Sequence, residues 1–460
     1  MLHRHTLILA LSMLVLAACE QPTPSSPAAS DDDRSAVLSL PPAKSFAPRA
    51  GTPAQRSNRQ IAQDFLDLSF TMESGRTLPF LTRFEEPIRV SVRPGAPAIL
   101  NVELSRLLRR FRNEARIDIA RAQRGQDAQI VIQAIPRRDL QRAVPAAACF
   151  VVPNVNGWED FKRKRNRSVT DWTKLKSRTR ATIILPSDVS PQEIRDCLHE
   201  EIAQALGPLN DLYRLPDSTF NDDNFHTVLT GFDMLILRAY YSPELPNGIT
   251  REEAAKRLPR VLARLNPRGQ QRRGAVLSPT PATWSRAISG ALSPRTSSTR
   301  RATFASQAVR IAEQQGWRDN RLAFSLFVQG RATLGSSSES AVKAFIQAGE
   351  IYNSLFGNSV QTAHVATQMA AFSLSTGQAN TAISIINSAL PPTSASQNAA
   401  LLATLLMIKA EALEFQGRTA EARKVRLDSL GWGRYGFGSE PNVRARLTEI
   451  KALVPARAKN

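Results

Sequence analysis

Cysteine, histidine and aromatic residues are scarce in this 460-residue sequence, which has 3 cysteines, 5 histidines and 6% aromatic residues. Three cysteines are too few for a fold held together by disulfides. Glycine and proline are dispersed along the chain, which excludes a fibrous protein. Hydrophobic residues make up 42% of the sequence, so a fully disordered chain is excluded as well. At this length, two folded units are expected.

Acidic residues are outnumbered, with 40 Asp and Glu against 60 Lys and Arg and a formal net charge of +20. Such an excess predicts anionic surroundings or partners but does not indicate a fold. The densest basic segment is residues 162–180, which holds nine Lys and Arg residues beside Trp158 and Trp172. An ordinary solvated surface is the alternative interpretation of this segment.

Long apolar runs are also missing, because no stretch reaches the roughly 18 residues expected of a membrane-spanning helix. A shorter run, Leu7–Leu16, follows Arg4 and ends in Leu-Ala-Ala-Cys19. This pattern resembles the lipobox of bacterial lipoprotein signals. The resemblance implies that residues 1–18 are removed and that Cys19 is joined to membrane lipid. It places the protein in the envelope of a Gram-negative bacterium, facing the periplasm, and Glu20 favours the outer membrane.

An exported location narrows the partners of the basic segment. It excludes nucleic acid and leaves anionic envelope components, such as lipid head groups, lipopolysaccharide phosphates and peptidoglycan carboxylates. Residues 19–57 are dense in Pro, Ser, Ala and Asp and show no apolar period, so they are expected to form a disordered tether.

With Cys19 lipidated, Cys149 and Cys197 remain as a pair. An oxidising compartment favours a single intramolecular disulfide between them. Two inert buried thiols are the alternative, whereas zinc is disfavoured because neither cysteine has a second Cys or His at ligand spacing.

Residues 58–265 mix strand and helix periods and predict an α+β unit. Apolar residues alternate over 88–92 as in a strand, and those of 100–122 recur at helical spacing. Further strands are expected near 128–135, 149–152 and 181–185. Residues 266–300 contain turn formers and arginine without periodicity, which indicates a basic linker.

Residues 301–460 predict an all-α domain. Alanine follows glycine by five residues twice, at Gly377 with Ala382 and at Gly417 with Ala422. These residues resemble the tetratricopeptide repeat, in which glycine turns one helix into the next and alanine allows close packing. Pro391 and Pro392 are expected to close the first unit. A plain helical bundle is the alternative.

The sequence Ser190-Pro191-Gln192-Glu193 predicts the start of a helix that ends near Leu206. At about 100° per residue, Glu201 falls within the apolar arc of this helix, whereas His199 and Ala203 point away from it. A carboxylate in that position requires a partner, and an arginine from a neighbouring element is the simplest one.

The same helix carries a degenerate motif. A zinc motif H-E-x-x-H beginning at His199 fails because residue 203 is alanine. One residue later, Glu200-Glu201-x-x-Gln204-x-x-Gly207-x-x-Asn210-Asp211 resembles the metzincin signature H-E-x-x-H-x-x-G-x-x-H-D. The resemblance spans roughly residues 80–245 and implies a first strand, a long helix, further strands, the site helix, a turn at Phe220 where methionine would lie, and a closing helix. It extends to a proteobacterial envelope lipoprotein family with this degenerate signature.

The metal-ligand positions that the resemblance implies, Glu200, Gln204 and Asn210, lack imidazole, whereas the general-base position, Glu201, is retained. One carboxylate and two amides make a poor zinc site and suit a hard cation only weakly. We therefore expect empty ligand positions, no cofactor, and a non-catalytic binding protein whose helical repeats engage a protein partner. One alternative is a hydrolase of peptides or cell-wall material that uses Glu201 with zinc or another divalent metal. Another is an envelope assembly scaffold.

Overall fold

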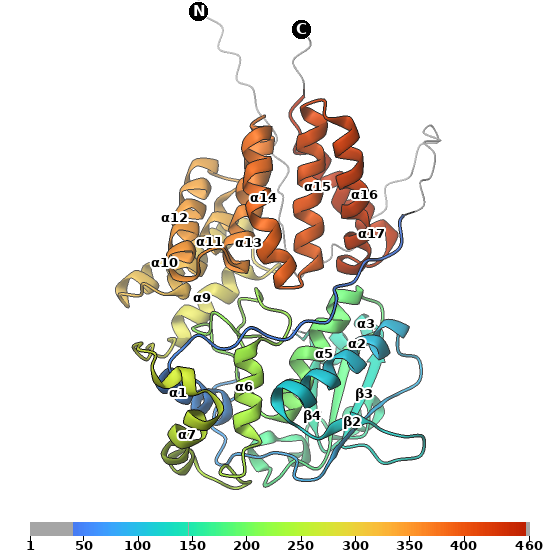
Figure 1. Ribbon diagram of the computed structural model, residues 1–460, viewed down its shortest axis with the longest axis vertical. Helices are drawn as coiled ribbons and strands as arrows, with labels where there is room; N and C mark the ends of the chain where they lie inside the picture. Colours follow the sequence, from blue (N-terminus) through green and yellow to red (C-terminus); the bar gives the residue numbers. More distant parts are fainter. Residues whose placement is uncertain (1–39, 146, 457–460) are drawn as a thin grey trace, which may run out of the picture.

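The computed structural model describes residues 40–145 and 147–456, in which a mixed α/β region is followed by an all-helical region (Figure 1). The helical region lies above the α/β region in this view. The expected signal segment 1–18 and Cys19 lie outside the described residues. No helix in the described ranges is both long and apolar enough to cross a membrane.

The α/β region is built on a five-stranded sheet of order β2-β1-β3-β5-β4. Its strands are β1 (Ile88–Val92), β2 (Ile119–Arg121), β3 (Ile130–Ile135), β4 (Phe150–Pro153) and β5 (Ala181–Pro186). Four strands are parallel, and β4 is an antiparallel edge strand on β5. All six residues of β5 are buried, as expected of a parallel strand covered on both faces.

Helices cover both faces of this sheet. The α-helices of the region are α1 (Asn58–Ser69), α2 (Ala98–Arg110), α3 (Arg137–Ala143), α4 (Trp158–Lys164), α5 (Pro191–Leu206), α6 (Gly231–Tyr240) and α7 (Arg251–Leu265). Apolar residues of α2 and α5 pack on one face, and those of α3 and α4 pack on the other. The expected helix 100–122 ends early, because a π-turn at Phe111–Ala115 and a left-handed Arg116 (φ 59°) lead into β2.

The remainder of the chain is helical. Its helices are α8 (Pro267–Gln270), α9 (Ala282–Leu292), α10 (Ser298–Gln314), α11 (Asn320–Thr333), α12 (Ser338–Phe356), α13 (Val360–Ser375), α14 (Ala379–Ala395), α15 (Ala399–Phe415), α16 (Thr419–Gly436) and α17 (Glu440–Lys451). Gly377 and Gly417 turn α13 into α14 and α15 into α16 with φ of 75° and 78°. Ala382 and Ala422 are fully buried, in keeping with the expected close packing.

Three expectations about helix and linker boundaries were wrong. Residues 266–300 are not a linker, since they contain α8, α9 and the start of α10, and Trp284 is fully buried. Pro391 and Pro392 do not close a unit, because α14 continues through them to Ala395. The described part of the expected tether, residues 40–57, is docked: Phe46 stacks on Trp432 with ring centroids 4.4 Å apart.

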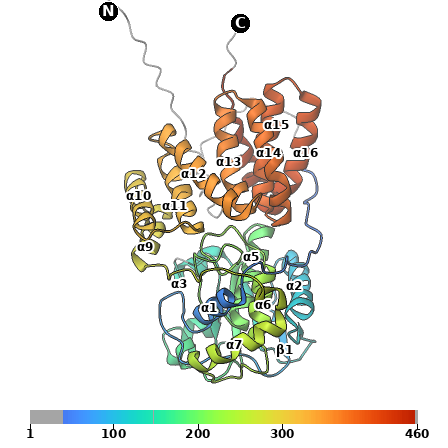
Figure 2. The same cartoon turned by 60° about the vertical axis from the view of Figure 1, so that its left-hand side comes forward.

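The two regions contact each other through α5 and α16, and residues 40–57 run along their boundary to α1 (Figure 2). Phe225, from the loop between α5 and α6, belongs to the hydrophobic core of the helical region. In the first turn of α5, the Gln192 side-chain amide donates to the Asn398 side chain over 3.1 Å, and the Gln192 side-chain oxygen accepts from the Ala400 N–H over 2.9 Å. The helical region therefore holds both α5 and the loop that follows it.

Candidate functional site

Helix α5 begins where its sequence predicts, with the Ser190 hydroxyl accepting from the Glu193 N–H and Pro191 in the first turn. The helix is central in the fold and is covered on every side from Leu198 to Leu206 except at Glu200, which is half-buried. His199 and Ala203, which were expected to point away from the apolar arc of the helix, are buried as well. The His199 Nδ1 accepts from the Leu229 N–H over 3.1 Å.

The end of α5 is held by Arg178. Its guanidinium donates to the backbone carbonyls of Gln204 and Ala205 over 2.6 and 2.8 Å, and it lies 4.8 Å from the Trp172 ring centroid. Arg178 is only 4% exposed, so it is a structural residue and does not belong to the basic surface expected over 162–180. Lys164, in the same segment, pairs with Asp160, which leaves less uncompensated charge than the sequence suggests.

Cys149 and Cys197 form a disulfide that joins the start of β4 to α5, with Cα atoms 6.0 Å apart. Gly207 lies directly after α5, where a Cβ atom would come within 3.0 Å of the Tyr240 ring. Any larger residue would therefore push Tyr240 away from the end of the site helix. These two features set the distance of α5 from the edge of the sheet and from α6.

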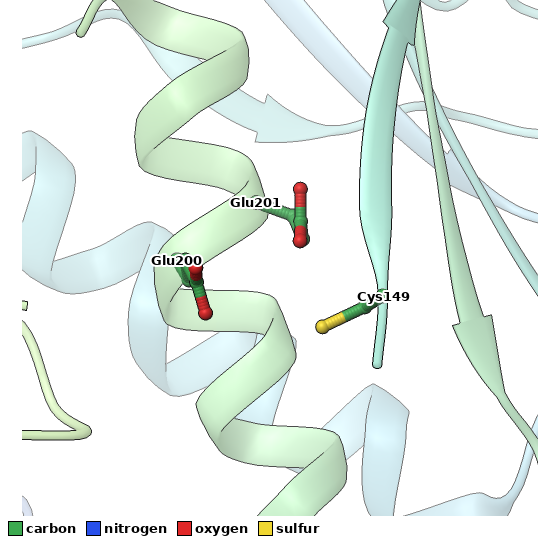
Figure 3. Close-up of side chains that lie close together, drawn as sticks. All are labelled: Cys149, Glu200 and Glu201. Atoms are coloured by element: carbon green, nitrogen blue, oxygen red, sulfur yellow. The ribbon is translucent and has the colours of Figure 1, made fainter. Parts of the chain in front are cut away.

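Glu200 and Glu201 lie beside the disulfide. One carboxylate oxygen of each and the Cys149 sulfur all lie within 4.8 Å of one another (Figure 3). Since the sulfur is bonded to Cys197, it is not a thiolate and cannot act as a metal ligand. Glu201 is 3% exposed, and its buried Oε2 has no hydrogen-bond partner among the described residues. The expected arginine partner of Glu201 is therefore wrong.

The other two predicted ligand positions donate hydrogen bonds through their amides. Gln204 Nε2 donates to Glu73 Oε1 over 3.1 Å, and Asn210 Nδ2 donates to the Asp67 carbonyl over 2.9 Å. Glu73 lies in the turn after α1, where its N–H donates to the Leu209 carbonyl over 3.1 Å. Sequence reasoning missed Glu73, because no periodicity or motif marks a turn residue so far along the chain from α5.

Burial raises the pKa values of the carboxyl groups at this site, and repulsion between them adds to its effect. Burial, reinforced by the negative charges of Glu73, Asp222 and Asp196, raises the pKa of Glu200 to about 8. Burial, then Glu200 and Glu73, raises the pKa of Glu201 well above its usual value. The pKa of Asp211 is raised in the same way by burial, Glu73 and Glu200. The carboxylates thus favour protonation or a bound cation over a cluster of free negative charges.

Asp211 and Asp222 lie in the loop between α5 and α6, which the helical region clamps. Phe225 stacks on the His364 ring with centroids 4.4 Å apart and contacts Phe324 and Tyr352 edge-on. In the same loop, Phe220 is fully buried, and its carbonyl accepts from the Leu212 N–H over 2.9 Å. The position of the acidic loop therefore depends on both regions of the chain.

The donors around Glu200 do not suit zinc. A catalytic zinc site takes imidazole or thiolate donors with at most one carboxylate. Here the oxidised Cys149 sulfur is unsuitable, and His199 is engaged with the Leu229 backbone. His226 contacts Gln361 of the helical region, and no histidine of the described residues belongs to the group of ligand atoms around Glu200 and Glu201. The residues present are oxygen donors, so the zinc of a metallopeptidase does not fit them.

A comparison with known protein families finds a match within the α/β region. Residues 58–260 match a family described as "Protein of unknown function (DUF2927)". The match ends close to the boundary between the α/β region and the helical region. No curated protein and no solved structure matches the chain.

Proposed function

We propose that this protein is a lipid-anchored envelope protein whose α/β region is metzincin-like and binds extended peptides without cleaving them. The succession of elements supports the ancestry: β1, the long helix α2, further strands, the site helix α5, the turn at Phe220 and the helix α6. This is the order that the resemblance in the sequence implies. In such catalytic domains the substrate lies as an extended strand along an edge of the sheet.

The observation that carries this proposal is the free edge of β4 beside the site helix. Asn154 N–H donates to the Arg180 carbonyl over 3.0 Å, and Val152 is paired with Thr182 two residues earlier. Because hydrogen-bonded residues alternate in an antiparallel pair, the N–H and C=O of Val151 face away from β5. No backbone hydrogen bond from another part of the described chain reaches Val151. An extended peptide can therefore pair with it.

Loss of catalysis follows from the donors around Glu201. A metal of the zinc class is what lowers the pKa of bound water towards neutrality in a metallopeptidase. The disulfide sulfur and the engaged amides of Gln204 and Asn210 leave no such ligand set. Binding then remains as the proposed function of the β4 edge.

Anchoring and partner capture complete the proposal. Cys19 would tether the protein to the membrane, and its resemblance to a lipidated cysteine is the support for this. The helical region, which we propose to be tetratricopeptide-like, would engage a protein partner through its exposed helix faces. The remaining basic residues of 162–180 would bind anionic components of the envelope.

The test uses a permanently unfolded polypeptide, fluorescein-labelled carboxymethylated α-lactalbumin, with the protein lacking residues 1–19 of the lipid signal. We expect a rise in fluorescence anisotropy on binding and no new fragments in mass spectra. Val151→Pro removes the outward N–H and should weaken binding about tenfold, the value of roughly one hydrogen bond. Val151→Thr keeps that N–H and should bind as the parent does.

Two results would overturn the proposal. Fragments that a chelator suppresses would show that the site is catalytic. Equal binding by the Val151→Pro and Val151→Thr variants would show that the β4 edge is not the peptide site. Thermal melting of both variants checks that the sheet is intact, which is expected because proline is tolerated where the N–H of an edge strand faces outward.

A further inference from the structure

A cavity lies at the β1 side of the sheet. It has a volume of about 360 Å³ and is formed by the end of β1, by the chain that connects β2 to β3, and by Asn156 after β4. Since β1 lies between β2 and β3 in the sheet, this connection crosses β1, and it does so over residues 122–129. The volume is at the lower end of the range of about 300–1,000 Å³ that is typical of sites for small molecules.

The lining of this cavity is basic and polar. Three arginines belong to it: Arg93 directly after β1, Arg121 at the end of β2, and Arg124 in the connection to β3. Arg93 is held by Asn156, whose side-chain oxygen accepts from Nη2 of the arginine over 2.6 Å. The other side chains that can donate or accept hydrogen bonds to a ligand are Ser91, Gln123, Gln126 and Asn156.

The charges of these three arginines are not balanced by the protein. The acidic side chain in the lining is Asp127, and it is already paired with Arg180 over 2.9 Å. Within residues 40–145 and 147–456, no ion pair joins any of the three arginines to a carboxylate. Arg89 of β1, which is outside the lining, differs because it pairs with Asp118 over 3.2 Å. Three like charges around one cavity repel one another, so an anion bound there is favoured electrostatically.

The cavity also lies where ligands commonly bind in sheets of this type. In open sheets of parallel strands, ligands bind outside the carboxyl ends of the strands, where adjacent strands connect to opposite sides. After β1 the chain continues to β2, whereas after β3 it continues to β4 and β5 on the other side of the sheet. The cavity is at the carboxyl ends of β1 and β2, next to this point.

We propose that this cavity binds a small anionic sugar, a monosaccharide that carries a phosphate or a carboxylate. Arginine presents a planar fork of donors that matches the oxygens of either group in a bidentate manner. The amides and the hydroxyl beside the arginines provide the donors and acceptors that sugar hydroxyls require. Among the described residues, the lining contains no aromatic ring, so a nucleobase would find no stacking partner.

This site is separate from the peptide site proposed above. In the sheet, β3 and β5 lie between β1 and β4. The inference therefore stands whether or not the β4 edge binds a peptide.

Calorimetric titration of the protein without residues 1–19 with glucose 6-phosphate and with glucuronate tests the proposal. We expect one molecule to bind, and the tighter of the two ligands identifies the anionic group as phosphate or carboxylate. Glucose, which lacks the charge, and inorganic phosphate, which lacks the sugar, should each bind at least about tenfold more weakly. Binding should also weaken as the NaCl concentration rises.

Arg121→Gln and Arg124→Gln each remove one charge at an exposed position, so each should weaken binding about tenfold while the melting temperature stays near that of the parent. Arg109→Gln is the matched control, because Arg109 is exposed on α2 and does not line the cavity. Absence of binding by both anionic sugars at millimolar concentration would overturn the proposal. So would equal affinity for glucose or for inorganic phosphate, or binding by Arg121→Gln and Arg124→Gln at the strength of the Arg109→Gln control.

Discussion

Acidification should weaken the packing of the helical region against the loop between α5 and α6, because His364, which takes part in this contact, is buried and neutral. His364 of α13 stacks on Phe225 with ring centroids 4.4 Å apart, and its Nε2 has no hydrogen-bond partner within residues 40–145 and 147–456. Burial, with smaller contributions from Arg331 and His226, lowers the pKa of His364 from 6.5 to about 3. His364 therefore binds a proton near pH 6.5 in the unfolded chain, whereas in the folded chain it binds one only near pH 3.

The sign and size of the effect follow from linkage. Since the folded pKa is depressed, stability is highest above pH 6.5 and declines as the pH falls towards 3. The pKa of His364 is 6.5 in the unfolded state and about 3 in the folded state. This difference reduces the free energy of unfolding by about 1.4 kcal/mol at pH 5.5 and by less than about 0.1 kcal/mol at pH 7.5. His364 alone should thus lower the free energy of unfolding by about 1.3 kcal/mol between these two values.

The assay is urea unfolding of the parent and of His364→Phe at pH 7.5 and 5.5. Phenylalanine keeps the stack on Phe225 and does not titrate, so the change in unfolding free energy with pH should be about 1.3 kcal/mol smaller in the variant. Other titrating groups, such as Asp223 and His226, contribute equally to both proteins and cancel in the comparison. An identical change with pH in the two proteins would refute the assignment of His364 as a buried neutral group.

Two further perturbations test the same architecture. Phe225→Ala should lower the free energy of unfolding in urea by about 3–5 kcal/mol, because the side chain is 3% exposed and lies in the core of the helical region. Phe80→Ala, at an exposed position, should change this free energy by less than about 0.5 kcal/mol. Similar losses in the two variants would refute the role of Phe225 in holding the loop against the helical region. Reduction of the Cys149–Cys197 disulfide, which closes a loop of 48 residues, should lower unfolding stability by about 4 kcal/mol on the chain-entropy estimate, and an unchanged midpoint after complete reduction would contradict it.

Local sequence patterns predicted several strands of the α/β region and the start of α5. They failed where contacts between distant segments determine which residues are buried. The cap at Ser190 and the apolar periods of β1, β3 and β5 depend on hydrogen bonds and side chains a few residues apart, so they can be recognised in the sequence. The region 266–300 shows the opposite case. Its α9 contains Trp284, which is buried by α10 and α11, and no local pattern reveals that burial.

Some residues of the candidate site could be found in the sequence and others could not. Glu200 and Glu201 were found because their spacing from Gln204 and Asn210 resembles the metzincin signature. Glu73 could not be found, because it reaches α5 only through the packing of the turn after α1. The expected arginine partner of Glu201 failed for a related reason: Arg178 of the basic segment donates to the carbonyls at the end of the helix instead.

The sequence by itself determined the strands β1, β3, β4 and β5, the start of α5, the all-helical character of the last third and the lack of imidazole at positions 200, 204 and 210. Those properties rest on residue identity and on interactions within a few positions of the chain. Only the tertiary structure decided that Glu73 accepts a hydrogen bond from Gln204 of α5, that Val151 faces a free edge, and that residues 40–57 and Phe225 dock against the helices. Each of these depends on distant segments being packed together, and hence on the free energy of the whole fold.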